Sequence, residues 1–116
     1  MSDMKELKTI VRTESVARLV EALQNAGVSR LWVCHVHSLG AGVDPEDFRP
    51  SFEEGASYTE KAKLEFLAPA DQVDDLIDVV REHAGTGHRG DGVVVVTDVA
   101  DVVNVRTGDH DRLALL

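Results

Sequence analysis

The 116-residue sequence is poor in cysteine, proline and aromatic residues, and it contains no long apolar run. Its single cysteine, Cys34, excludes an intramolecular disulfide and is compatible with a reducing compartment. No segment approaches the ~20 consecutive apolar residues that span a bilayer, and residues 1–4 lack the apolar core of a signal peptide. We therefore expect a cytoplasmic protein that does not insert into membranes.

Basic residues are also scarce. The chain has 12 lysines and arginines against 21 aspartates and glutamates, which gives a formal net charge of -9 at pH 7. Because proteins bind phosphate backbones through clustered Lys and Arg, a nucleic-acid partner is not expected. The hydrophobic share of 43% and the charged share of 28% are ordinary for a globular chain, and the length predicts a single domain over residues 1–116.

Apolar residues recur with two periods along the chain. Alternation and β-branched runs predict strands at residues 5–12, 29–39, 58–67 and 93–97, the last of them short and buried. Helical spacing predicts helices at 14–26 and 70–84, with Thr13 capping the first and Gly27 and Gly85 at their ends. This order predicts an α+β, ferredoxin-like βαββαβ sandwich, with two helices on one face of a four-stranded antiparallel sheet.

Two stretches fall outside these periods. Residues 40–56 contain Gly, Pro and acidic residues without periodicity, so we expect a long loop at the tip of a hairpin. Residues 99–116 form a C-terminal extension whose structure the pattern does not assign.

Two glycine-containing turns are candidates for ligand binding. Residues 86–92 (TGHRGDG) lie between the second helix and the last strand, and their glycines permit positive φ and leave N–H groups open to an anion. Residues 104–109 (NVRTGD) add the guanidinium of Arg106, which can hold a phosphate with two hydrogen bonds. Taken singly, each turn can also be explained without a ligand. The first can be a tight connection between a helix and a strand, and the arginine of the second can simply be solvated.

Together the turns resemble those of the PII signal-transduction family, in which a helix leads into TGxxGDG, a strand follows, and an RTG turn comes near the end. Residues 36–40 (VHSLG) stand where the family has V-x-G-F-G, and residues 61–65 (KAKLE) match its K-V-K-I-E strand. The spacing agrees without gaps from Gly40 to Lys61 and on to Thr86. The resemblance covers nearly the whole chain and implies a PII-like homotrimer that signals and catalyses no reaction.

The resemblance also implies an adenine nucleotide bound in clefts between subunits, with Leu39 and Leu67 beside the adenine and residues 90–92 and Arg106 at the phosphates. The implied nucleotide-binding residues are Ile10, Leu39, Gly40, Lys61, Glu65, Leu67, Arg89, Gly90, Asp91, Gly92 and Arg106. Nucleotide occupancy would order or release the long loop, which then docks on a membrane transporter or an enzyme.

Several positions depart from the family pattern. Val93 replaces a lysine after GDG, and Asn104 replaces the first arginine of R-x-R-T-G, so two cationic phosphate contacts are lost. At ~1.5–3 kcal/mol for each charge-assisted bond, this favours ADP or AMP over ATP. Gly42 replaces the glutamine that serves magnesium and 2-oxoglutarate binding, and Glu54 replaces the uridylylated tyrosine. The chain thus resembles divergent PII-like proteins, some of which respond to ADP or AMP and accompany bicarbonate transport.

Two other functions remain as alternatives. A metal-responsive or structural trimer of the same fold, of the divalent-cation tolerance type, would use histidines such as His35 and His37, but these two alone do not complete a tetrahedral site, and no bound metal or cofactor is expected. A small enzyme is the other alternative, although Cys34 and His35, adjacent on a strand, point to opposite faces and cannot share a proton. We expect Cys34 to be a buried structural thiol.

Overall fold

The structure is a computed structural model, and it describes residues 3–40, 49–51 and 56–116. The strands are β1 (Met4–Arg12), β2 (Trp32–Ser38), β3 (Arg49–Ser51), β4 (Ala56–Pro69) and β5 (Gly92–Asp98). The α-helices are α1 (Val16–Asn25) and α2 (Val73–Ala84), and 3₁₀ turns precede each of them, η1 (Thr13–Ser15) and η3 (Ala70–Gln72). A further 3₁₀ segment, η4 (Asp111–Leu115), lies near the C-terminus.

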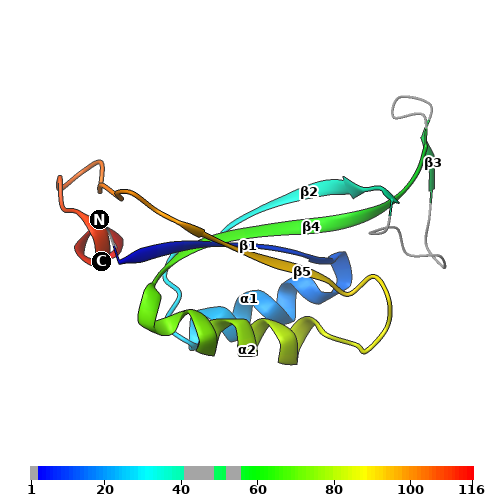
Figure 1. The fold of residues 1–116 in the computed structure, drawn as a ribbon, viewed down its shortest axis with the longest axis horizontal. Coiled ribbons are helices and arrows are strands. Elements are labelled where there is room, and N and C mark those ends of the chain that lie inside the picture. The colour runs from blue at the N-terminus through cyan, green and yellow to red at the C-terminus, as the bar shows by residue number, and fades with distance from the viewer. Residues whose placement is uncertain (1–2, 41–48, 52–55) are drawn as a thin grey trace.

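The main sheet is antiparallel and has the strand order β2-β4-β1-β5. Both helices pack against the same face of this sheet (Figure 1). The predicted βαββαβ arrangement is therefore confirmed. The short strand β3 pairs with the first residues of β4, an addition that the sequence pattern did not predict.

The core lies between the sheet and the two helices. Alternate residues of β1 and β4 point to this side, as the period of two predicts: Leu7 and Val11 from β1, and Leu64 and Phe66 from β4, are at most 2% exposed. The helices contribute Leu19, Leu23, Leu76 and Val80. Each fully buried side chain of this size contributes about 1.5–3 kcal/mol to folding, so this layer fixes the register of the sheet.

Local details differ from the predictions at the helix starts and in the long loop. Thr13 does not cap the first helix, because the chain enters it through η1 and the Thr13 hydroxyl lies 3.3 Å from a carboxylate oxygen of Glu14. Residues 41–48 and 52–55, which hold most of the predicted loop at 40–56 and the replaced positions Gly42 and Glu54, lie outside the described residues. Within that range Arg49–Ser51 forms β3 rather than loop.

The sheet face away from the helices is open in the single chain. Register places Trp32, Cys34, Val93 and Val95 on this face, and Trp32, Val93 and Val95 are 45–57% exposed. The prediction of a buried last strand is wrong for the single chain, because β5 is an edge strand covered by helices on one face only. The prediction of a buried Cys34 is also wrong for the single chain. Cys34 lies on the open face of β2, the other edge strand, and its side chain is exposed.

The C-terminal extension is structured. Val103 and His110 form an isolated antiparallel bridge, and η4 follows. The guanidinium of Arg112 joins this segment to the rest of the chain through ion pairs of 2.8 Å with Asp3 and 3.2 Å with Asp71. The extension therefore lies beside the N-terminus, at the end of the sheet opposite to the loop between α2 and β5 (Figure 1). Among the described residues, no helix is long and apolar enough to cross a bilayer.

Candidate functional site

The glycine turn, residues 86–92, is organised around the carboxylate of Asp91. One carboxylate oxygen accepts the backbone N–H groups of Thr86, at 2.7 Å, and Gly87, at 2.9 Å. The other accepts the hydroxyl of Thr86 and, at 3.3 Å, Nε of Arg12. A loop that contains three glycines is thus held from within by the side chain of Asp91.

Two cations from the sheet hold the turn from the β1 and β4 side. Arg12, the last residue of β1, also donates to the backbone carbonyl of Arg89 at 2.8 Å. Lys61 of β4 donates to the carbonyl of Gly90, and its side chain is almost fully buried. Because both carbonyls are engaged, the peptide units at 89–91 are fixed in orientation. The sequence pattern did not predict a role for Arg12; its place at the end of β1, directly paired with Lys61, was the available signal.

The electrostatics of the turn follow from these contacts. Partial burial alone would raise the pKa of Asp91. The hydrogen bonds from the Thr86 hydroxyl, the Thr86 and Gly87 amides and Arg12 outweigh that effect, and they hold the pKa of this carboxyl well below its usual range. Asp91 is therefore ionised at neutral pH, and its charge is balanced by Arg12.

Glycine is required at the start of β5 for a steric reason. Gly92 has φ +116°, and a Cβ at this position would lie 1.7 Å from the carbonyl oxygen of Ile10 on β1. Gly90 has φ +99°, a conformation that side-chain-bearing residues rarely adopt. The predicted ligand-binding glycines thus have a structural role of their own, and Gly92 in particular allows β5 to begin in close contact with β1.

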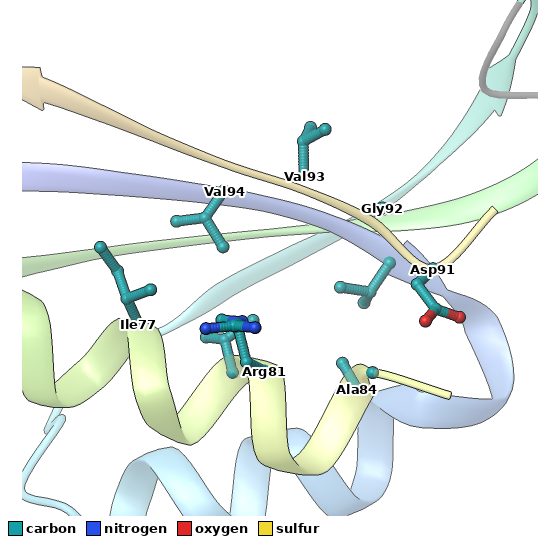
Figure 2. Close-up of a pocket in the computed structure, with 10 residues that line it drawn as sticks. Ile77, Arg81, Ala84, Asp91, Gly92, Val93 and Val94 are labelled. Atoms are coloured by element: carbon teal, nitrogen blue, oxygen red, sulfur yellow. The ribbon is translucent and has the colours of Figure 1, made fainter. Parts of the chain in front are cut away.

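A pocket of about 290 Å³ opens beside the turn, between the C-terminal half of α2 and the start of β5. Ile77, Arg81 and Ala84 of α2 line it from below, and Val94 lines it from the strand (Figure 2). Asp91 lies at its end, next to Gly92. Small-molecule sites usually measure about 300–1,000 Å³, so this hollow alone is at the lower limit for a complete ligand.

The second predicted turn lies elsewhere in the single chain. Arg106 belongs to the C-terminal extension, which follows β5, whereas the glycine turn precedes β5 (Figure 1). At a rise of about 3.3 Å per residue, the 7 residues of β5 separate the two by about 20 Å. The Arg106 side chain is exposed and, among the described residues, takes part in no ion pair. One chain therefore does not bring Arg106 to residues 90–92.

The remaining predicted residues lie on the open side of the sheet or directly after β2. Ile10 pairs with Lys63 and Val93, directly beside the glycine turn. Leu39 and Gly40 follow β2, where Leu39 is 42% exposed and Gly40 has φ +69°. Glu65 forms an ion pair of 3.2 Å with Lys63. Leu67 and Glu65 are partly buried towards the far end of β4, so they are not part of the glycine turn.

The histidines do not assemble into a metal centre within the described ranges. His35 and His37 are exposed on β2, and the ring of His37 stacks on Tyr58 at a centroid distance of 3.8 Å. His83 and His110 bond to the Val79 carbonyl and to Asp101. Among residues 3–40, 49–51 and 56–116, no group of three or more His, Cys, Asp or Glu side chains converges as a metal site would require.

Comparison with known proteins gives consistent results. The sequence model of the family described as nitrogen regulatory protein P-II matches residues 4–109. Nitrogen regulatory protein P-II 1 of Methanothermobacter thermautotrophicus is 30% identical over 115 residues, 99% of this chain and 100% of the relative. Nitrogen regulatory protein P-II 1 of Escherichia coli K12 is 31% identical over 112 residues, 97% of this chain and 100% of the relative.

Solved structures agree with the sequence comparison. Arabidopsis thaliana PII bound to citrate superposes with a TM-score of 0.78 at 30% identity, covering 99% of this chain and 92% of that one. The GlnK–ATP complex of B. subtilis superposes with a TM-score of 0.80 at 26% identity, covering 99% of each chain. The family resemblance of the sequence is confirmed: this chain belongs to the nitrogen regulatory protein P-II family of signalling proteins.

Proposed function

We propose that this protein is an adenine-nucleotide sensor whose site is completed only when copies of the chain assemble into a trimer. The observation that carries the proposal is the glycine turn, which is held rigidly by Asp91, Arg12 and Lys61 before any ligand arrives. Within the described residues the backbone N–H groups of Arg89 and Gly90 have no intramolecular acceptor, so they are available to an anion. The ATP complex of B. subtilis GlnK supports a nucleotide as the ligand.

Assembly supplies what the single chain lacks. The glycine turn and Arg106 lie at opposite ends of β5, too far apart for one phosphate chain to contact both. A neighbouring copy that docks against the open sheet face would cover Trp32, Val93 and Val95, and it would bring its own Arg106 towards the glycine turn. The exposed apolar side chains on this face favour such an interface, because a contiguous apolar surface on a monomer is costly in water.

The charges at the two turns favour ADP or AMP as the ligand. Val93 and Asn104 provide no positive charge at the positions where the family resemblance places cations. Each missing charge-assisted contact costs about 1.5–3 kcal/mol, and the loss is greatest for a triphosphate because it carries the most charge. The remaining cations at the site would be Arg89 and Arg106, with Lys61 and Arg12 already engaged in holding the turn.

Signalling would follow from nucleotide occupancy rather than from catalysis. We propose that the bound nucleotide orders or releases the segment between β2 and β4, and that this segment then binds a membrane transporter or an enzyme in the cytoplasm. Bicarbonate is the second effector that we propose. These steps rest on the family membership and on the differences at Val93 and Asn104.

Isothermal titration of the assembled protein with AMP, ADP and ATP, with and without magnesium and bicarbonate, tests the proposal. We expect micromolar binding, about -8 kcal/mol, with AMP or ADP ahead of ATP. The variant Val93→Lys restores one cation on the open sheet face and should raise the affinity for ATP about tenfold relative to the affinity for AMP. Thr97→Lys is the matched control, because it adds the same charge four residues further along the same face of the same strand.

Three results would contradict the proposal at different levels. Absence of binding by any of the three nucleotides would make the glycine turn a structural connection only. Tighter binding of ATP than of ADP in the unmodified protein would contradict the nucleotide preference but leave the site intact. A stable monomer in sedimentation experiments that nevertheless binds nucleotide would contradict the shared site.

A further inference from the structure

Asn104 is a buried polar residue at the start of the C-terminal turn, and all of its polar groups are engaged. Its side-chain carbonyl oxygen accepts the backbone N–H groups of Arg106, at 2.9 Å, and Thr107, at 3.0 Å. Its side-chain Nδ2 donates to the carbonyl of Ala114 at 2.9 Å. Its backbone N–H donates to the backbone carbonyl of Asp109 at 2.8 Å. Its backbone carbonyl accepts the backbone N–H of Gly108, also at 2.8 Å.

These five hydrogen bonds fix the direction of the turn. The bonds to Arg106 and Thr107 hold two consecutive peptide units, and the bond to Ala114 ties the turn to η4 below it. Only 7% of Asn104 is exposed, so the side chain points into the protein and does not reach a ligand itself. Arg106, in contrast, extends into solvent from a backbone whose N–H is held by Asn104.

We propose that Asn104 is a positioning residue for Arg106, and that through this contact it sets the affinity of the site for the phosphate groups of the nucleotide. The inference rests on the proposed function, because it assigns Arg106 to a phosphate. A preorganised arginine loses less conformational freedom when it binds than one on a loose loop does. Asn104 thus offsets part of the phosphate affinity that is lost because this position carries no arginine.

A double-mutant cycle in the assembled protein tests this inference. The variants are Asn104→Ala, Arg106→Ala and the double substitution, and titrations with ADP and with adenosine are the readout. We expect Asn104→Ala to weaken ADP binding about tenfold and adenosine binding less than twofold, because adenosine has no phosphate for Arg106 to contact. The double variant should bind ADP as weakly as Arg106→Ala alone, since Asn104 acts only through Arg106.

The controls separate positioning from folding. Val105→Ala alters a fully exposed neighbour in the same turn and should leave both affinities unchanged. Asn104→Ser is a milder variant whose hydroxyl can still accept a turn N–H, and it should fall between wild type and Asn104→Ala. If Asn104→Ala does not fold, Asn104→Ser takes its place in the cycle. The variants are then Asn104→Ser, Arg106→Ala and the two substitutions combined.

The outcomes distinguish this inference from the proposed function. If the unmodified protein binds ADP and Arg106→Ala weakens it, but Asn104→Ala has no effect, the positioning role is wrong and the nucleotide site stands. Additive losses in the double variant, or equal losses for ADP and adenosine, also overturn the positioning role. If neither the unmodified protein nor any variant binds ADP, the proposed function itself is wrong and this inference falls with it.

Discussion

Two turns of this molecule are built in the same way but differ in charge. In the glycine turn the side chain of Asp91 accepts two consecutive backbone N–H groups, from Thr86 and Gly87. In the C-terminal turn Asn104 accepts two consecutive N–H groups as well. Asp91 is ionised and balanced by Arg12, whereas Asn104 is neutral and buried.

The difference indicates what each turn is adapted to. A carboxylate beside the proposed phosphate site must have its charge neutralised, and Arg12 together with the three hydrogen bonds from Thr86 and Gly87 achieves this at Asp91. A neutral amide needs no counter-ion. Because Asn104 rather than a carboxylate accepts the N–H groups of the C-terminal turn, no negative charge beside them competes for the guanidinium of Arg106. Both turns also contain a glycine with positive φ, Gly92 and Gly108, but for different reasons.

The largest expected effect is the difference in stability loss when each of these two glycines is replaced by alanine. Gly92→Ala places a Cβ 1.7 Å from the Ile10 carbonyl, so β5 must move away from β1, and we expect the free energy of unfolding to fall by about 3 kcal/mol or more. Gly108→Ala meets nothing within 4 Å and should cost only the strain of φ +76°, about 1 kcal/mol. Chemical denaturation of both variants measures the difference, and equal losses would refute the close approach at Gly92.

A reciprocal exchange of the two organising residues is the next test. Asp91→Asn keeps one acceptor but loses the charge that Arg12 and the Thr86 donors stabilise, so we expect a loss of about 1–2 kcal/mol. Asn104→Asp introduces a carboxylate where 7% of the residue is exposed, and it removes the donor to Ala114, so a similar loss is expected. Urea titrations at neutral pH compare the two variants.

The pH dependence should differ between the exchanged variants. The folded pKa of Asp91 is lowered, so its stabilising contribution is present above the unfolded value of about 3.8 and is lost as the pH falls towards the folded value. Asp91→Asn should therefore lose less stability than wild type between pH 5 and pH 3. An identical acid dependence in both proteins would show that this carboxylate does not contribute.

The sequence predicted the sheet and the helices because their burial is settled within one chain. Alternation placed Leu7 and Leu64 towards the helices, and the structure has them there. The run at Val93 to Thr97 was predicted to be buried, yet helices cover only one face of β5, and among the described residues no strand pairs with its outer edge. A hydrophobic run predicts that a segment is buried. It does not show whether the residues that bury it belong to the same chain or to another copy.

The candidate site was only partly predictable for a related reason. The glycines of the turn are visible as a motif, and Thr86 and Gly87, which donate to Asp91, belong to it. The two cations that hold the turn do not: Arg12 is 79 residues from Asp91 in sequence, and Lys61 reaches the Gly90 carbonyl from β4. Similarly, the pattern shows Asn104 only as the loss of an arginine, since its burial and its hydrogen bond to Ala114 depend on the fold of the extension. Local patterns identify the turns, whereas the cations that hold the glycine turn come from distant parts of the sequence.

The smallest expected effect concerns His110, which closes the C-terminal turn by bonding to Asp101 at 2.9 Å and bridging to Val103. The hydrogen bond to Asp101, with the charges of Asp101, Asp111 and Asp109, raises the pKa of this imidazole above 6.5. Its contribution to closure is therefore fully present below about pH 6.5 and is lost as the pH rises through the folded value.

Hydrogen exchange at the amides of Asn104 and Gly108, which bond across the turn, measures that closure. We expect their protection factors to fall by a few-fold between pH 6 and pH 8 in the unmodified protein, because the side chain is exposed and solvent screens the pair. His110→Gln should show a smaller change over the same range, since its side chain does not titrate. The amides of Thr86 and Gly87 in the glycine turn provide the internal control, because Asp91 stays ionised throughout this range, and a parallel fall there would assign the effect to global unfolding rather than to His110.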